Sequence, residues 1–155
     1  MSSEPQEGSG PAWPVLDGVF VAGARAQTWA LACPPATVLC LRRRRPQLSD
    51  YPARWQQDLV LLHWPLTYWQ TDQPVQRLHT TVELVAALPK PLVAHCALGL
   101  DRAGMVALAV LVNSGLPLSQ ALDRYRCRGV RLPEDAAMAV LTQFAHPQAE
   151  GRTWR

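Results

Sequence analysis

The stretch HCALGLDRAG, residues 95–104, decides how this chain folds and which kind of ligand it can hold. It follows the apolar residues 91–94, which are typical of a short buried strand. It precedes residues 105–112, whose apolar side chains on nearly every face predict a buried helix. A strand, a tight loop and a helix start direct backbone N–H groups and the positive end of the helix dipole toward one point. The sequence therefore predicts an anion-binding loop between a strand and a buried helix.

Two side chains give this loop its chemistry. Helix N-termini and neighbouring cations favour the thiolate form of a cysteine, so we expect Cys96 to attack a phosphate ester as a nucleophile. Arg102 presents a planar fork of donors that matches two phosphate oxygens. Gly99 and Gly104 stand where a loop around an anion needs positive φ or a close backbone approach. The alternative, a buried structural cysteine, leaves the two glycines and the arginine at the helix entrance unexplained.

The pattern His-Cys-x-x-Gly-x-x-Arg-x-Gly resembles the active-site loop of the cysteine-dependent protein tyrosine phosphatases, most of all their dual-specificity and atypical bacterial branch. Residues 19–23 and 36–41 resemble the first two strands of that family, and residues 121–131 resemble the helix after the active site. The resemblance implies that Cys96 is the nucleophile and that Arg102 binds phosphate. It also implies that the phosphate site is lined by Ala97, Leu98, Gly99, Leu100, Asp101 and Arg102.

Two further loop positions bear on the mechanism. His95 directly precedes the thiol, and we expect it to bond to the loop backbone and support the thiolate from behind. Most relatives carry Ser or Thr directly after the arginine, where the hydroxyl helps the thiolate leave the phosphoenzyme. This chain has Ala103 there, which predicts that the cysteinyl phosphate breaks down slowly compared with its formation.

The general acid is the least determined part of the site. Hydrolysis needs a carboxyl group that protonates the leaving oxygen and later activates water. Tyrosine-specific relatives carry it as Trp-Pro-Asp, but this chain has Trp64-Pro65-Leu66. The next carboxylate is Asp72, which could instead cap the helix that follows it. The rival is Asp101, inside the loop, whose other interpretation is a carboxylate that pairs with an arginine. A third alternative is assistance by water or by the substrate.

The order of apolar segments predicts the fold. Four short runs, at residues 19–22, 37–41, 59–62 and 92–94, are typical of buried strands. Helical patterns alternate with them at residues 75–87 and 105–113, and two more helices follow from residues 118 and 133. This alternation favours an α/β fold with a mainly parallel central sheet of about four or five strands flanked by helices. Ligands in such sheets bind at the carboxyl ends of the strands, where the loop falls.

Composition narrows the class of protein. The chain has 155 residues, of which 48% are hydrophobic and 17% charged, with a net charge of +3. We expect one phosphatase domain over residues 13–146, a disordered tail over 1–12 and a flexible tail over 147–155. The four cysteines lack metal-ligand spacing, so no metal or cofactor is expected. No apolar run reaches the ~18–20 residues of a membrane span, and the mild charge does not call for nucleic acid. We therefore expect a cytoplasmic protein.

These observations predict a cysteine-dependent phosphatase for phosphotyrosine, and for phosphoserine or phosphothreonine as further substrates, acting through a cysteinyl-phosphate intermediate. One alternative is a phosphatase for phosphoinositides or another phosphorylated small molecule. Another is a pseudophosphatase that binds phosphorylated partners without turnover. The basic run at residues 42–45 is either a solvated turn or a rim that attracts anionic substrates. Trp64, Tyr68 and Trp69 either grip an aromatic substrate or pack their own loop against the sheet.

Overall fold

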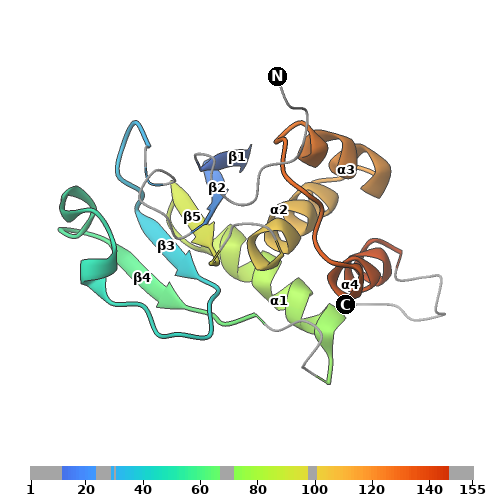
Figure 1. Ribbon diagram of the computed structural model, residues 1–155, viewed down its shortest axis with the longest axis horizontal. Helices are drawn as coiled ribbons and strands as arrows, with labels where there is room; N and C mark the ends of the chain where they lie inside the picture. Colours follow the sequence, from blue (N-terminus) through green and yellow to red (C-terminus); the bar gives the residue numbers. More distant parts are fainter. Residues whose placement is uncertain (1–11, 24–28, 30, 67–71, 98–100, 147–155) are drawn as a thin grey trace.

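A five-stranded sheet forms the centre of the molecule (Figure 1). The computed structural model describes residues 12–23, 29, 31–66, 72–97 and 101–146. The strands are β1 (Trp13–Leu16), β2 (Val19–Ala22), β3 (Thr37–Cys40), β4 (Val60–His63) and β5 (Leu92–His95). Their order is β1-β2-β5-β3-β4, with β1 antiparallel to β2 and the other pairs parallel. The predicted α/β class and mainly parallel sheet are thus confirmed.

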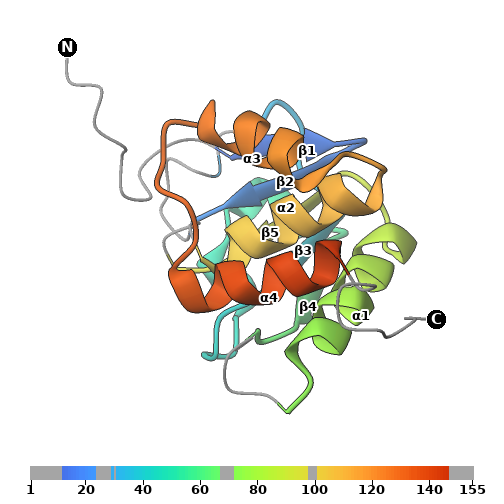
Figure 2. The same ribbon diagram turned by 90° about the vertical axis from the view of Figure 1, so that its right-hand side faces the viewer.

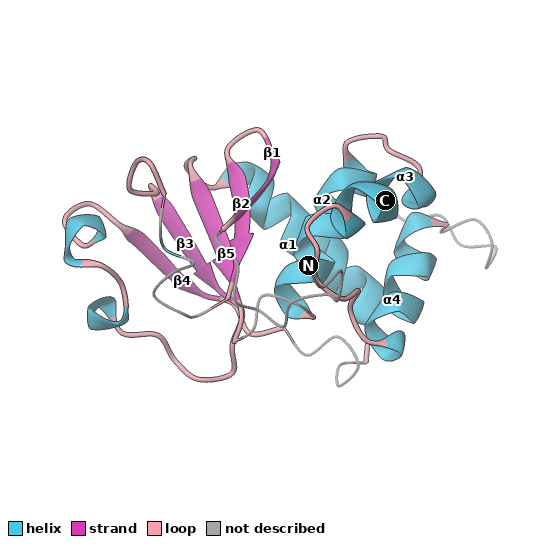
Figure 3. Cartoon of the chain, turned by 45° about the horizontal axis from the view of Figure 1, so that its top comes forward, coloured by secondary structure: helices cyan, strands magenta, loops and turns pink. Residues whose placement is uncertain are grey.

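The four α-helices lie together on one side of the strands (Figure 3). They are α1 (Pro74–Ala87), α2 (Arg102–Asn113), α3 (Leu118–Arg126) and α4 (Asp135–Ala145). Figure 2 shows α2 in the middle of this layer, between α3 and α4 and against the strands. Its central place explains its composition, because all nine residues from Ala103 to Leu111 are buried. The sequence did not reveal that the helices would share one face.

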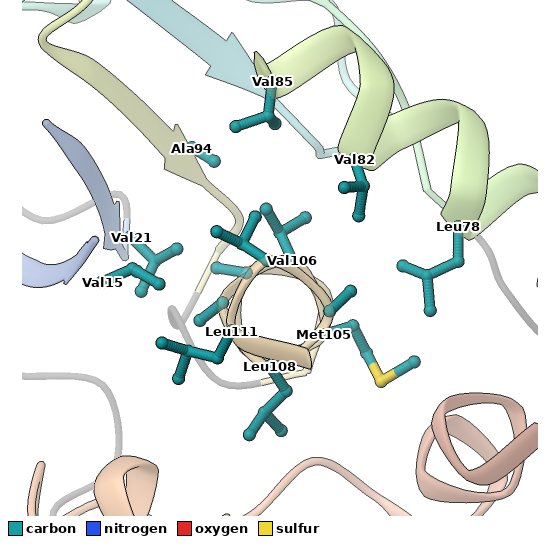
Figure 4. Packing of buried hydrophobic residues seen from close by; sticks show 14 of the residues in the cluster. Val15, Val21, Leu78, Val82, Val85, Ala94, Met105, Val106, Leu108 and Leu111 are labelled. Atoms are coloured by element: carbon teal, nitrogen blue, oxygen red, sulfur yellow. The ribbon is translucent and has the colours of Figure 1, made fainter. Parts of the chain in front are cut away.

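The main core surrounds α2 (Figure 4). Val15 and Val21 approach α2 from the β1–β2 hairpin, and Val82 approaches it from α1. Burying each such side chain stabilises the fold by about 1.5–3 kcal/mol. The core therefore fixes the axis of α2 and, with it, the position of its first turn.

Among the described residues, the other face of the sheet is covered mainly by the segment that joins β3 to β4. Two short 3₁₀ turns, Leu48–Asp50 and Ala53–Trp55, lie in the segment that joins β3 to β4. Tyr51 and Trp55 from this segment pack with Trp29 against Val38 and Val93 of the sheet. Aromatic rings thus replace a helical layer on this face, and they bury the side chains that the parallel strands direct toward it.

Register aligns the carboxyl ends of the parallel strands at one edge. Ala22 and Cys40 both pair with His95, the last residue of β5, and Cys40 also pairs with His63. Since β5 lies in the middle of the sheet, the chain that leaves it emerges between β2 and β3. This edge is where the predicted anion-binding loop begins.

Candidate active site

Cys96 lies between the central strand and the central helix. It directly follows β5, and its backbone N–H donates to the carbonyl oxygen of Ala22 at 3.3 Å. The side chain is only 2% exposed. The backbone N–H of Ala103, in the first turn of α2, donates to the Cys96 sulfur at 3.4 Å. A helix N-terminus that points at a thiol stabilises the thiolate, so this environment suits a nucleophile.

Arg102 opens α2 on the same edge of the sheet. Its guanidinium Nη1 donates to the carbonyl oxygen of Leu41, the residue after β3, at 3.4 Å. The Leu41 N–H in turn donates to the carbonyl oxygen of His95 at 2.8 Å. These two hydrogen bonds connect the end of β3 to β5, which precedes Cys96, and to Arg102.

Not every loop residue named from the sequence can be placed. Ala97 is exposed beside the thiol, whereas Leu98, Gly99 and Leu100 lie outside the described residues. Gly104 has a different role from the one expected. A Cβ atom there would lie 2.6 Å from the hydroxyl of Tyr125 and 3.1 Å from Cγ of Pro133. The missing side chain of this glycine therefore leaves room for Tyr125 and Pro133.

His95 is fully buried in an aromatic surround. Its Nε2 lies 2.7 Å from the hydroxyl oxygen of Tyr51, and its ring meets that of Trp29 edge to face at 5.1 Å. Burial, and next the cation of Arg42, lower the pKa of His95 to about 3, so the imidazole is neutral. Burial also raises the pKa of Tyr51, which keeps its hydroxyl protonated. Sequence reasoning missed Tyr51, because no local pattern marks it as a neighbour of the loop.

The Asp101 carboxylate is hydrogen-bonded to the segment that joins α3 to α4. Its two carboxylate oxygens accept hydrogen bonds from the guanidinium of Arg131 at 2.8 and 3.1 Å. The backbone N–H of Glu134 donates to the same carboxylate at 2.9 Å. The bonds from Arg131, above all, hold the pKa of Asp101 below its usual value. The arrangement ties the residue before Arg102 to the segment that joins α3 to α4.

Leu66 and, in part, Trp64 pack inward from the Trp64-Pro65-Leu66 stretch, whereas Pro65 is exposed. Leu66 is fully buried, and its N–H donates to the carbonyl oxygen of Leu41 at 3.1 Å. The indole N–H of Trp64 donates to the hydroxyl of Thr81 on α1 at 3.0 Å, and the guanidinium of Arg77 lies 3.7 Å above its ring. Trp64 therefore packs its segment against α1, while Tyr68 and Trp69 lie outside the described residues.

Asp72 is exposed and stands just before α1. The expectation that it could cap this helix is wrong, because α1 begins at Pro74 and Gln73 is its N-cap. The ring of Pro74 holds its backbone in a helical conformation, which makes Pro74 the first helical residue. The N-cap position therefore falls on Gln73, one residue after Asp72.

Neither a cluster of metal-ligating side chains nor a membrane-spanning helix is present in the described part of the chain. It contains no group of three or more His, Cys, Asp or Glu side chains that could hold a metal ion. None of the helices found there is long and apolar enough to cross a membrane.

Three solved structures, named here as examples, share this fold. Human DUSP28 is 18% identical, with a TM-score of 0.70 over 94% of this chain and 99% of that one. Tk-PTP in its active form is 24% identical, with a TM-score of 0.66 over 87% of this chain and 96% of that one. The core catalytic domain of the PP-IP phosphatase SIW14 from S. cerevisiae is 16% identical, with a TM-score of 0.68 over 92% and 91% of the two chains.

Sequence comparison identifies the family directly. No curated protein matches the chain. The tyrosine phosphatase family, however, matches residues 60–143, which is more than half of the chain. The matched part includes β5, the loop with Cys96 and Arg102, and α2. This chain therefore belongs to the tyrosine phosphatase family, within the superfamily of cysteine-dependent phosphatases.

Proposed function

We propose that this protein hydrolyses phosphate monoesters through a covalent intermediate on Cys96. The observation that carries the proposal is the nearly buried thiol at the start of α2, with the Ala103 N–H directed at its sulfur at 3.4 Å. The sulfur forms a bond to phosphorus while the ester P–O bond breaks, and the leaving oxygen takes a proton from an acid. Water then attacks the same phosphorus and gives a proton to the conjugate base of that acid, while the S–P bond breaks to release inorganic phosphate and regenerate the thiolate.

Arg102 binds the transferred phosphoryl group in this scheme. Its planar guanidinium offers donors to two equatorial oxygens, and backbone amides at the start of α2 supply further donors. Because these groups are held by the sheet edge and by the core around α2, little reorganisation is needed as charge shifts in the transition state.

Asp72 is our choice for the general acid. A general acid must carry a proton at the working pH, and a carboxyl with a lowered pKa is ionised there. Asp101 has such a pKa, and Arg131 and Glu134 already occupy its oxygens. We assign Asp101 the task of holding the Arg102 end of the loop in place. We expect Asp72→Asn to lower kcat more than Asp101→Asn does, and the opposite order would contradict the assignment.

The absence of a side-chain hydroxyl at position 103 supports slow hydrolysis of the cysteinyl phosphate. Ala103 is fully buried and contributes only its backbone N–H to the sulfur. We expect a burst of product whose amplitude equals the enzyme concentration. Ala103→Ser should shrink the burst, and a strictly linear time course for the unmodified protein would contradict this step.

Phosphotyrosine is the substrate class we propose first, with phosphoserine and phosphothreonine as further substrates. The family match supports it. A small phosphorylated molecule is the second candidate, favoured by the similarity in fold to the PP-IP phosphatase SIW14 and by a basic run beside the site. A pseudophosphatase would bind both kinds of ligand without releasing phosphate.

The first test measures phosphate release from p-nitrophenyl phosphate in reducing buffer with EDTA. The unmodified protein is compared with Cys96→Ser and, as a control, with Cys127→Ser, which alters an exposed cysteine on the far end of α3. Activity that survives chelation, is lost in Cys96→Ser and is kept in Cys127→Ser is the expected result. A folded protein that releases no phosphate from aryl phosphates, phosphopeptides or inositol phosphates would overturn the proposal.

A further inference from the structure

The acidic residue at the start of α2 does not cap its own helix. Asp101 is the N-cap residue of α2, a position where an aspartate carboxylate ordinarily accepts the N–H of the second or third helical residue. Its side chain forms no such bond to the described residues of this helix, and its backbone is helical, with φ −80° and ψ −65°, instead of extended. The first N–H groups of α2 are therefore left to other acceptors.

One of these N–H groups is already used by the proposed nucleophile. The second and third residues of α2 are Ala103 and Gly104, so their N–H groups are the ones that a capping carboxylate would bind. The Ala103 N–H donates instead to the sulfur of Cys96 at 3.4 Å. Capping by Asp101 would thus compete with the thiolate, and with a phosphate group bound at the same end of the helix.

Arg131 determines where the carboxylate of Asp101 lies instead. Its Nη1 and Nη2 donate to the two carboxylate oxygens at 2.8 and 3.1 Å, a bidentate pair with a fixed geometry. Nη1 also donates to the carbonyl oxygen of Leu132 at 3.0 Å, which holds the guanidinium on the segment between α3 and α4. The third donor to the carboxylate is the N–H of Glu134, the N-cap residue of α4. Asp101 therefore serves the start of α4, although it directly precedes α2.

The charge of Asp101 makes its position important for an anion site. The hydrogen bonds from Arg131 are the largest cause that lowers the pKa of Asp101, and the cation of Arg102 acts in the same direction. The group is therefore an anion at neutral pH, and it lies within the electrostatic reach of the arginine that binds phosphate in our scheme. Loss of Arg131 would leave the charge of Arg102 and the positive end of α2 to attract this carboxylate.

We propose that Arg131 is a positioning residue that keeps the Asp101 carboxylate away from the first N–H groups of α2 and from Arg102. This inference rests on the proposed function and deepens it, because it names the residue that leaves the phosphate site open. Without Arg131, the carboxylate acts as an internal anion that competes with phosphate. Only the fraction of molecules with an open site then binds phosphate, and the apparent Kd rises in inverse proportion to that fraction.

The test measures binding and turnover in matched variants. The Kd of inorganic phosphate is determined by calorimetry, and kcat and KM are determined with p-nitrophenyl phosphate. Arg131→Gln is compared with Arg131→Lys and with the double variant Asp101→Ala/Arg131→Gln. The control is Arg126→Gln, because it removes an arginine from an exposed ion pair with Asp123 at the end of α3.

We expect Arg131→Gln to raise the phosphate Kd and KM together by roughly five- to tenfold, about the strength of a carboxylate cap at a helix N-terminus. The effect on kcat should be much smaller, because saturating substrate displaces the carboxylate. The double variant removes the competing anion and should recover most of the loss in both constants. Arg131→Lys keeps a cation beside Asp101 and should show a smaller loss, and Arg126→Gln should show none.

Two results would overturn the inference. A double variant that binds phosphate as weakly as Arg131→Gln would mean that the pair only fastens the loop to the α3–α4 segment. An unchanged phosphate Kd in Arg131→Gln would mean that the carboxylate does not reach the site. If circular dichroism shows that Arg131→Gln does not fold, Arg131→Lys with and without Asp101→Ala gives the same comparison.

The two proposals fail in different ways. A protein that binds phosphate but releases none from any substrate contradicts the proposed function, whereas the phosphate Kd values of the variants still decide the role of Arg131. Absence of phosphate binding to the folded, unmodified protein would overturn both.

Discussion

Tyr51→Phe removes one hydroxyl oxygen from the buried environment of His95. The ring contacts of Tyr51 with Trp29, at 5.6 Å, and with Trp55, at 6.3 Å, are kept. What is lost is the 2.7 Å hydrogen bond to Nε2 of His95, a residue with no exposed surface. Water cannot replace the missing hydroxyl without opening the aromatic cluster. The substitution therefore isolates the cost of one unsatisfied buried nitrogen.

That cost is about 1–3 kcal/mol of unfolding free energy, the penalty for leaving a buried polar group without its partner. For a domain of this size it corresponds to a fall in Tm of about 2–4 °C per kcal/mol. Urea unfolding followed by tryptophan fluorescence measures it, because Trp29 and Trp55 both touch Tyr51. The m-value should not change.

A double-mutant cycle with His95→Leu checks the reasoning. In the double variant neither partner is left unsatisfied, so Tyr51→Phe and His95→Leu should couple by roughly 1 kcal/mol or more. Purely additive single effects, or a Tyr51→Phe variant within about 0.3 kcal/mol of the unmodified protein, would refute the structural role of this bond.

The pH dependence of stability provides an independent readout on the same pair. The pKa of His95 falls from 6.5 to about 3 on folding, so the unfolded chain binds the extra proton. Stability from this group is complete above pH 6.5 and is lost progressively as the pH falls toward 3. His95→Leu should flatten the unfolding free energy in this window, and an unchanged slope would show that His95 does not titrate as described.

Two further predictions concern close packing near the loop. Leu66→Asp creates the Trp-Pro-Asp pattern of tyrosine-specific relatives. Because the Leu66 side chain is fully buried, this substitution should lower the free energy of unfolding by about 3 kcal/mol or more. It should not raise turnover. A stable variant with increased kcat would contradict that placement. Gly104→Ala should destabilise the fold by about 1–3 kcal/mol, because its new Cβ meets the Tyr125 hydroxyl at 2.6 Å. Tyr125→Phe should relieve part of this loss, and thermal unfolding of the single and double variants tests both statements.

One strand and one helix boundary differ from what was expected from the sequence. The strand β1 was not predicted, although Asp17-Gly18 between apolar residues is a strong signal for a two-residue hairpin turn. Both residues have positive φ, 46° and 79°, as such a turn requires. Gln73, and not Asp72, caps α1, which is a shift of one residue of the size that helix boundaries commonly show.

The sequence by itself determined the loop, the parallel strands and the buried helix after the loop. Cys96 and Arg102 are six positions apart, and a strand, a loop and a helix that follow one another directly are set by local propensity and hydrophobic period. The all-round apolar pattern of residues 105–112 likewise required a central helix, and α2 lies at the centre of the core.

Only the tertiary structure decided what surrounds the loop. Tyr51 reaches His95 across 44 positions, and Arg131 reaches Asp101 across 30. Periodic patterns report which face of an element is buried but not which distant side chain meets it there. Those meetings depend on strand order and on the route of each connection, which together bring β3, β5 and the α3–α4 segment to one edge. Sheet order thus set the partners of Asp101 and the buried place of Leu66.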